Sequence, residues 1–533
     1  MTSVKYTTAT LLAAFVLTST ASAISYEAPS NYYNSATSTG SALKSQLRQI
    51  MTNGHDPTSY DDLKTAFKYT DTDPNNPNNV LLIYDRDSQT GNWNSGDFWD
   101  REHIWPKSLQ GSGSNRNDSH ALRPSTPKLN STRGNKPFGG TYGQTSMGAN
   151  GSFWYPGDQD AGDVARSLFY SATRYSHLSL KNGSASNNNM GDLSGLIRWH
   201  YLDTPDEFEL RRNHAVYGGE VDSYKGYTYT NPKAQNNRNA YIDRPEYAWS
   251  VYMDQQNDTS LYFGSSANAD GSSSKTVDLG TVIKGASSVN TSYTATLNKD
   301  GFDGTYYSVS TTSNLTSSVT GRYNAFAMDS SGSRDIHLNL DANTSQIGEQ
   351  TGTVTVDNLD VTTQGGSGHG ANDGDDTVTL ALTVLDHSNA SFSSSLDQDT
   401  LTIDFGYIEA NKEFTETFDI FNYATSSFTA DLDLDSITSS GDASAFDLDL
   451  NTFSNLAAND KATYTASINS AFSGPLQATY TLNLSDEDLP GATGSQTLSI
   501  NLLANVAPIP EPTSLALLGL AGIITLSNRR RSL

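Results

Sequence analysis

The sequence contains no cysteine, and this absence removes several classes of chemistry. Without thiols the chain can form no disulfide framework, no thiolate zinc site and no cysteine nucleophile, so any metal ion must be held by oxygen or imidazole. Hydrophobic residues are also few, at 35% of 533 residues, which excludes a polytopic membrane protein. Because aromatic residues reach 10%, a wholly disordered chain is excluded as well, and the length predicts several domains.

Tryptophan and arginine become scarce after about residue 260. All six tryptophans lie before residue 250, and residues 262–505 contain only Arg322 and Arg334. Residues 24–261 carry 22 Lys and Arg against 26 Asp and Glu, whereas residues 262–505 carry 7 against 31. The net charge of -25 therefore belongs almost entirely to the second part. Repulsion from a polyanionic nucleic acid is expected of that part and not of the first.

The N-terminal residues predict an export signal. Lys5 precedes an apolar run at residues 11–17, and small residues with an Ala-x-Ala pattern follow up to Ala23. A run this short does not span a bilayer and is typical of a secretory signal peptide. We therefore expect residues 1–23 to be removed and the mature chain to be exported, to the cell surface or the extracellular space.

The C-terminal residues combine three features in a fixed order. Pro510-Glu511-Pro512 precedes an apolar stretch at residues 515–526, and a basic cluster follows at residues 529–531. A short apolar segment with basic residues after it is held at the cytoplasmic face during export. Residues 508–533 resemble the PEP-CTERM sorting signal, which implies processing by an exosortase. A plain C-terminal membrane helix is the alternative.

The acidic part of the chain has the pattern of β-structure. Short runs of β-branched and aromatic residues alternate with Gly, Asn, Asp and Ser turns, which predicts all-β sandwiches. The segment at residues 277–283 is echoed at residues 403–409, so we expect two tandem modules, at 262–386 and 387–505. They resemble the immunoglobulin-like repeats of bacterial surface proteins, which implies association with the cell surface or with exopolysaccharide.

Residues 97–140 are dense in catalytic residue types. In Glu102-His103, a carboxylate that can bind a hard cation precedes an imidazole whose ordinary pKa, near 6.5, suits a general base. Neighbours on a strand point to opposite faces, yet both groups must reach one site. We therefore expect the backbone to leave regular strand geometry here, before Pro106.

A helix is predicted to start just after this pair. Thr126 is a good N-cap residue and Pro127 suits the first helical position. Asn130 then lies on the first turn, and its side-chain oxygen can point toward Glu102 and His103. This is the minimal geometry for a site with one metal ion, one general base and one substrate phosphate. Arg133 and Lys136 add cations that can pair with phosphate.

At these residues the chain resembles the bacterial endonuclease I family, which are secreted or periplasmic nucleases with a ββα-metal (His-Me finger) core. The resemblance covers about residues 24–255, in family order, through the block at Glu102-His103 and the segments 31–36, 60–64, 71–80, 162–166 and 237–246.

The resemblance implies the fold, the reaction and the roles of particular residues. His103 would be the general base, and Glu102 and Asn130 the ligands of Mg²⁺, with Mn²⁺ or Ca²⁺ as alternatives. The reaction would be hydrolysis of DNA or RNA phosphodiesters to 5′-phosphate products with little sequence preference. The whole chain would be an α+β nuclease domain at residues 24–261 followed by two β-sandwiches.

Two departures from the family pattern concern the loop between the base and the helix. Ala121 stands where the family commonly has Asn or His, at a position that supports the loop. The phosphate-stabilising arginine has no certain counterpart, and Arg116 and Arg123 compete for that role.

A stripe at helical spacing, Asp163, Arg166, Tyr170 and Arg174, either contacts phosphates and bases or is a solvated face. Arg166 is our fourth phosphate-binding candidate, beside Arg116, Arg133 and Lys136. Two other functions remain open. One is a surface-attachment protein with an inactive nuclease-like domain, which Ala121 alone supports. The other is a phosphatase or phosphodiesterase acting on small esters.

Overall fold

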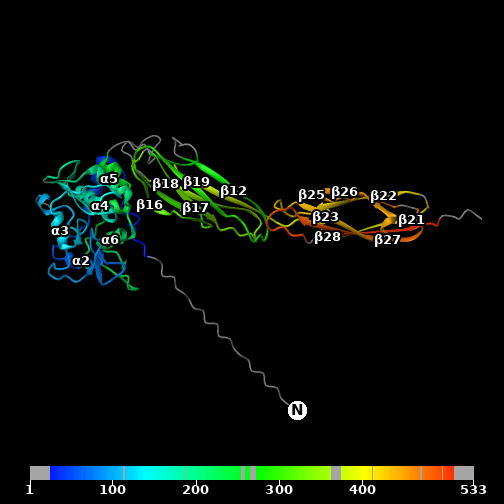
Figure 1. Ribbon diagram of the computed structural model, residues 1–533, viewed down its shortest axis with the longest axis horizontal. Helices are drawn as coiled ribbons and strands as arrows, with labels where there is room; N and C mark the ends of the chain where they lie inside the picture. The colour runs from blue at the N-terminus through cyan, green and yellow to red at the C-terminus, as the bar shows by residue number, and fades with distance from the viewer. Residues whose placement is uncertain are drawn as a thin grey trace, which may run out of the picture.

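The computed structural model describes residues 24–508, except for short segments at 112–113, 187, 254–258, 265–271, 330, 360, 362–373, 411, 469–470 and 495. The expected signal peptide and residues 509–533 of the sorting segment lie outside the described residues. An α+β region at residues 40–252 is followed by a mostly β region, and Figure 1 shows the parts arranged in a row. Within the described part, no helix is both long and apolar enough to cross a membrane.

The α+β region is built around one buried helix, α4. Every residue of α4 from Asp160 to Thr173 is buried, which is why its polar residues need partners inside the protein. The helices of this region are α1 (Gly40–Thr52), α2 (Leu63–Thr70), α3 (Pro127–Arg133), α4 (Asp158–Arg174), α5 (Leu193–Leu202), α6 (Glu207–Tyr217), α7 (Ala240–Asp243) and α8 (Tyr247–Tyr252).

Short two-stranded sheets lie among these helices. They pair β1 (Asn79–Leu81) with β2 (Ser88–Thr90), β3 (Asp100–His103) with β4 (Leu122–Ser125), β5 (Gly148–Asn150) with β6 (Phe153–Tyr155), β7 (Ser179–Leu180) with β8 (Asn189–Met190), and β9 (Val221–Asp222) with β10 (Thr228–Tyr229).

Strands β3 and β4 together with α3 form the ββα unit that the sequence predicts. The two strands are antiparallel, with Glu102 opposite Arg123 and His103 opposite Leu122. Helix α3 follows β4 directly and begins at Pro127, as predicted. Thr126 is its N-cap residue, although the hydroxyl of Thr126 donates to the Asp85 carboxylate and not to the helix.

The first β-sandwich packs a four-stranded sheet against a five-stranded sheet around one apolar core. The smaller sheet has the order β11 (Ser260–Phe263), β13 (Ser292–Asp300), β17 (Ser331–Leu340), β15 (Leu315–Ser317), and the larger has the order β12 (Ser274–Ile283), β19 (Asp376–Leu385), β18 (Gly348–Asn358), β14 (Thr305–Thr311), β16 (Gly321–Phe326). Because β11 pairs with β13, residues 260–261 belong to this sheet, which corrects the expected domain boundary after residue 261.

The second β-sandwich repeats this arrangement with a core of its own. Its sheets have the orders β20 (Ala390–Ser391), β22 (Phe414–Asn422), β26 (Lys461–Ile468), β24 (Phe446–Leu448) and β21 (Thr400–Ile408), β28 (Gln496–Val506), β27 (Gly474–Asp486), β23 (Leu432–Gly441), β25 (Phe453–Leu456).

The sequence echo corresponds to the same structural device in both sandwiches. β12 runs parallel to β19 with a bulge after Asp278, and β21 runs parallel to β28 with a bulge after Asp404. In each bulge the aspartate accepts a hydrogen bond from the backbone N–H of the glycine two residues later, Gly280 or Gly406. Both glycines have positive φ, 101° and 70°, which other residues rarely adopt.

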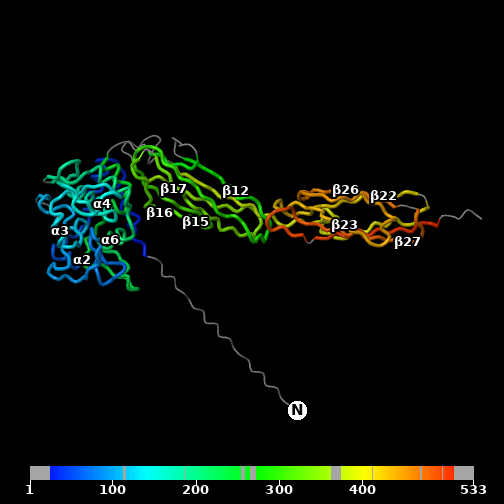
Figure 2. Tube along the Cα trace, viewed as in Figure 1, coloured from blue at the N-terminus to red at the C-terminus, as the bar shows by residue number. Residues whose placement is uncertain are grey.

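The first sandwich packs directly against the α+β region, as the trace in Figure 2 shows. Tyr306 is fully buried within the core of the α+β region, and its hydroxyl donates to the carbonyl of His200. Arg322 forms an ion pair with Glu246 across the same contact. The first sandwich thus keeps its own core and contributes Tyr306 and Ala325 to the core of the α+β region.

Candidate nuclease site

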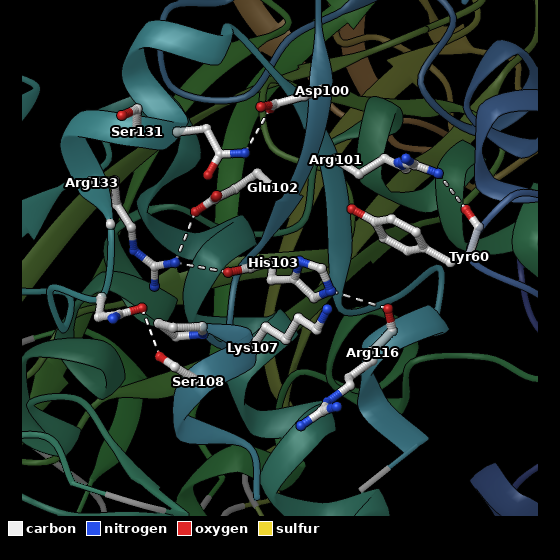
Figure 3. Close-up of a pocket in the computed structure, with 14 residues that line it drawn as sticks. Tyr60, Asp100, Arg101, Glu102, His103, Lys107, Ser108, Arg116, Ser131 and Arg133 are labelled. Atoms are coloured by element: carbon white, nitrogen blue, oxygen red, sulfur yellow. Dashed lines mark hydrogen bonds and ion pairs between the residues drawn. The ribbon is translucent and has the colours of Figure 1, made fainter. Parts of the chain in front are cut away.

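A cavity of about 700 Å³ lies beside the ββα unit, a size suited to a small ligand or one nucleotide step. Figure 3 shows its lining side chains. Four come from β3 and three from α3, and others come from loops; those discussed below are Tyr60, Asp100, Arg101, Glu102, His103, Lys107, Arg116, Asn130 and Arg133.

Glu102 and His103 both line this cavity, and regular strand geometry ends directly after them, at His103 and before Pro106. Both residues lie within β3, and His103 is its last residue. Asp100 and Glu102 therefore share one face of the strand, while Arg101 and His103 share the other. The cavity borders both faces, because all four residues of β3 line it.

The imidazole ring of His103 is held in one tautomer by a hydrogen bond to the backbone. Its Nε2 lies 3.1 Å from the backbone oxygen of Arg116. A carbonyl oxygen can only accept, so Nε2 carries the proton and Nδ1 keeps its lone pair. Burial lowers the pKa of His103 to about 4, with a further lowering from cations such as Lys107. The imidazole is therefore neutral at neutral pH.

The ring of His103 is also oriented by stacking. Tyr60 lies against it with ring centroids 5.6 Å apart and an interplanar angle of 20°. The guanidinium of Arg101 lies 3.6 Å from the centre of the Tyr60 ring, and its Nη1 donates to the Tyr60 carbonyl. Figure 3 shows the three side chains next to one another.

Glu102 is buried, with 1% of its surface exposed. Its Oε1 accepts hydrogen bonds from the Tyr84 hydroxyl at 2.8 Å and from Arg133 Nη1 at 2.9 Å. Burial raises the pKa of Glu102 to about 7, and the charge of Arg133 opposes that rise.

Arg133 lines the cavity and binds the backbone at the end of β3. Besides Glu102, it donates to the backbone oxygens of His103 at 2.7 Å and Ile104 at 2.6 Å. Its exposed fraction is 1%, so its Nη donors are directed at protein atoms. This placement gives Arg133 a structural role and does not support the phosphate contact expected from the sequence.

Asn130 is oriented by Asp100. Its Nδ2 donates to Asp100 Oδ1 at 2.6 Å, which leaves the amide oxygen for another ligand. Burial raises the pKa of Asp100. The sequence analysis missed Asp100, although its position two residues before Glu102 places it on the same strand face.

The donor atoms at this site fit a hard divalent cation. Among the described residues, neither Glu102 Oε2 nor Asn130 Oδ1 has a hydrogen-bond partner, and both side chains line the cavity. Carboxylate and amide oxygens suit Mg²⁺, which keeps several waters and needs few protein ligands. In the part of the chain that the structure describes, no three His, Asp or Glu side chains are grouped as a metal site.

Of the other predicted phosphate-binding residues, Arg116 lines the cavity and Lys136 does not. The Lys136 Nζ donates instead to the Thr132 carbonyl. Arg123, the competitor of Arg116, is buried and pairs with Asp71 and Asp163.

The prediction for Arg166 was wrong. Arg166 is fully buried and does not line the cavity. Its guanidinium forms ion pairs with Glu209 and Asp163. A buried guanidinium needs such partners and cannot reach a polymer substrate.

Ala121 does not line the cavity. It is 1% exposed and belongs to a small core cluster with Leu63, Phe67 and Trp99. Its backbone oxygen accepts from the N–H of Ile104, so this position supports the loop.

Comparison with known proteins identifies two parts of the chain. The family model for endonuclease I matches residues 39–246, and the model for the PEP-CTERM protein-sorting motif matches residues 508–531. An extracellular ribonuclease of Bacillus subtilis (strain 168) is 38% identical over 255 residues, which cover 44% of this chain and 83% of that protein. An extracellular ribonuclease of Bacillus amyloliquefaciens is 39% identical over 239 residues, 42% of this chain and 78% of that protein.

Likeness to solved structures is much weaker. Extracellular cadherin domains 1–4 of protocadherin gamma B7 match with a TM-score of 0.24 and 12% identity, over 48% of this chain and 52% of that one. A score this low carries no argument about the sandwiches. The sorting motif and the extracellular relatives indicate export to the cell surface or the extracellular space. Through its N-terminal region, the chain belongs to the endonuclease I family of nucleases.

Proposed function

We propose that this protein is an exported nuclease that uses a divalent cation to hydrolyse RNA, DNA or both to 5′-phosphate products with little sequence preference. The observation that carries the proposal is the lone pair of His103 Nδ1 in one cavity with the unbonded oxygens of Glu102 and Asn130. RNA is the first substrate to test, because both curated relatives are named ribonucleases.

His103 acts on the attacking water. Its Nδ1 accepts a proton from that water, the water oxygen forms a bond to phosphorus, and the bond from phosphorus to the 3′-oxygen breaks. The 3′-oxygen takes a proton from solvent, and His103 later returns its proton to solvent. The hydrogen bond to Arg116 and the stack on Tyr60 hold the ring throughout this exchange.

Glu102 and Asn130 would hold the cation, Mg²⁺ or alternatively Mn²⁺ or Ca²⁺, which supplies positive charge at the phosphate and the leaving oxygen. Arg133 keeps the Glu102 carboxylate in place, and Asp100 keeps the Asn130 amide in place. Arg116, Arg101 and Lys107 line the cavity and attract the substrate backbone. Backbone contacts carry no sequence information, so cleavage would be nearly independent of sequence.

The acidic sandwiches are proposed to be immunoglobulin-like spacers that carry the nuclease at the cell surface or in exopolysaccharide after exosortase processing. With 31 acidic against 7 basic residues, they would repel nucleic acid and so are not part of the substrate site.

The test uses the whole mature chain, because Tyr306 of the first sandwich lies in the nuclease core. His103→Ala should lower the cleavage rate for ribosomal RNA by about two to four orders of magnitude, the range of general-base catalysis. His177→Ala is the matched control, since His177 also bonds a backbone oxygen, that of Gln110, outside the cavity. EDTA should abolish wild-type activity on RNA and plasmid DNA. Wild-type rates in His103→Ala, or activity that persists in EDTA, would contradict the proposal.

The rival reading as an inactive surface protein gains no support from Ala121, which is buried away from the cavity. A small-ester phosphatase would prefer nucleotides to polymer, and the same assay with both substrates separates the two activities.

A further inference from the structure

A second cavity adjoins the proposed catalytic site. It has a volume of about 350 Å³ and is lined by His55, Arg116, Asp118 and Arg174, among others. Arg116 lines both cavities. A substrate that extends beyond the catalytic cavity in this direction therefore meets the second one next.

Arg174 provides an available cation in this cavity. It is the last residue of α4, and its Nε donates to the Met51 carbonyl at 3.2 Å. Its guanidinium lies 4.7 Å from the centre of the Tyr175 ring. In the described part of the chain its two terminal nitrogens have no hydrogen-bond partner. The arginine is thus anchored at Nε with its other donors free.

The nearest carboxylate does not neutralise the cavity. Asp118 lies 4.0 Å from Arg174 Nε, and both of its oxygens are already bonded. One oxygen accepts from the hydroxyls of Tyr170 and Tyr175, and the other from Gln235 and the His120 N–H. The cavity lining therefore carries one buried carboxylate, Asp118, and two guanidinium groups, those of Arg116 and Arg174, so positive charge is in excess.

His55 lines the same cavity. Its Nε2 is buried and has no partner among the described residues. Burial lowers the pKa of His55, so its neutral ring can donate one hydrogen bond. Two guanidinium groups and an imidazole N–H together suit the oxygens of a phosphodiester.

We propose that this second cavity binds the backbone phosphate that neighbours the scissile one, through Arg174 and His55, with Arg116 between the two phosphates. This subsite rests on the proposed nuclease function and extends it: the substrate is a polynucleotide strand held at two consecutive phosphates. The two arginines of the helical stripe thus have different roles: Arg166 is structural, and Arg174 contacts the substrate.

The experiment compares substrates with one and with several phosphates. A dinucleoside monophosphate offers only the scissile phosphate, whereas a pentanucleotide also reaches the second cavity. For the whole mature chain carrying Arg174→Gln, the ratio of kcat/KM for the pentanucleotide to that for the dinucleotide should fall about tenfold, the worth of one charge-assisted hydrogen bond. The fall should lie in KM, and Arg174→Lys should restore part of it. Dinucleotides with an added 5′- or 3′-phosphate identify the side on which the neighbour binds.

Binding is measured separately from cleavage. In EDTA, the affinity of Arg174→Gln for a single-stranded pentanucleotide should fall, and the slope of log K against log salt should become smaller by about 0.7, the value for one lost phosphate contact. Arg198→Gln is the matched control, because Arg198 is exposed on α5 and lines neither cavity.

His55→Ala provides a second probe if Arg174→Gln lowers the melting temperature. An unchanged ratio in both variants, or an equal loss on both substrates, would overturn the proposed subsite. A wild-type chain that binds the pentanucleotide but cleaves nothing would instead refute the proposed nuclease function, and the binding measurement would still test the subsite.

Discussion

Asn130 donates its amide hydrogen to Asp100 over 2.6 Å, so a residue of α3 is locked to the strand that carries Glu102 and His103. The bond decides which end of the Asn130 amide faces the cavity.

The first prediction concerns this bond. Asp100→Ala should weaken binding of the proposed cation about 10- to 100-fold, the usual cost of losing a partner that orients a ligand. Asp100→Asn retains an oxygen that can accept from Asn130 and should remain close to wild type. Mn²⁺ binding followed by electron paramagnetic resonance checks this without relying on activity. Asp97→Ala, which removes an exposed acid outside the cavity, is the control. Equal affinity in Asp100→Ala and wild type would refute the orienting role.

The second prediction concerns the stack on His103. Tyr60→Ala should lower kcat about three- to tenfold with little change in KM, because an aromatic pair is worth roughly 0.5–1.5 kcal/mol and orients the base. Tyr60→Phe keeps the ring and should keep the rate. Steady-state kinetics on RNA distinguishes these results, with Tyr227→Ala, an exposed tyrosine outside the cavity, as the control. A loss confined to KM would show that Tyr60 binds substrate and does not position His103.

The third prediction concerns pH and His200. Burial, followed by the charge of Arg166, lowers the pKa of His200 to about 3. Its Nδ1 is buried without a partner in the described part of the chain, so protonation there is unfavourable. Between about pH 6.5 and pH 3 the unfolded chain binds the extra proton, and stability falls as the pH drops, by at most about 1.4 kcal/mol per pH unit. Above pH 6.5 this contribution is fully present.

His200→Gln removes that dependence. The difference in unfolding free energy between pH 7 and pH 5, measured by urea denaturation, should be smaller in His200→Gln than in wild type. Other groups titrate in both proteins and cancel in the comparison. His337→Gln changes an exposed histidine of the first sandwich and should leave the difference as it is. If His200→Gln shows the full wild-type dependence, His200 is not its source.

The fourth prediction concerns the contact between the nuclease region and the first sandwich. A Cβ on Gly304 would lie 2.8–2.9 Å from ring atoms of Tyr201. Gly304→Ala should therefore lower the free energy of unfolding by about 1–3 kcal/mol, the usual effect of overpacking. It should lower the calorimetric melting temperature of the nuclease region and leave that of the second sandwich unchanged. Gly494→Ala, whose nearest neighbour is at 3.9 Å, is the control. An unchanged transition would show that the two regions are not coupled here.

The sequence predicted features that depend on neighbours along the chain. The start of α3 follows from Thr126 and Pro127, and the two tandem sandwiches follow from two short similar segments and the strand pattern around them. Features that depend on distant contacts were missed. Helical spacing identified the face of Arg166 but not its partner Glu209, which is 43 residues away. Tyr60 reaches His103 from a loop in the same way, and no local pattern in the sequence indicates that stack.

The bulges in β12 and β21 affect how readily two molecules of this protein can associate. Both strands lie at the edge of a five-stranded sheet, where unpaired N–H and C=O groups could recruit a strand from another molecule. The extra residue and the left-handed glycine interrupt that row at Gly280 and Gly406. A kinked edge is a poor template for pairing. We therefore expect copies of this protein not to pair with one another through these two edge strands.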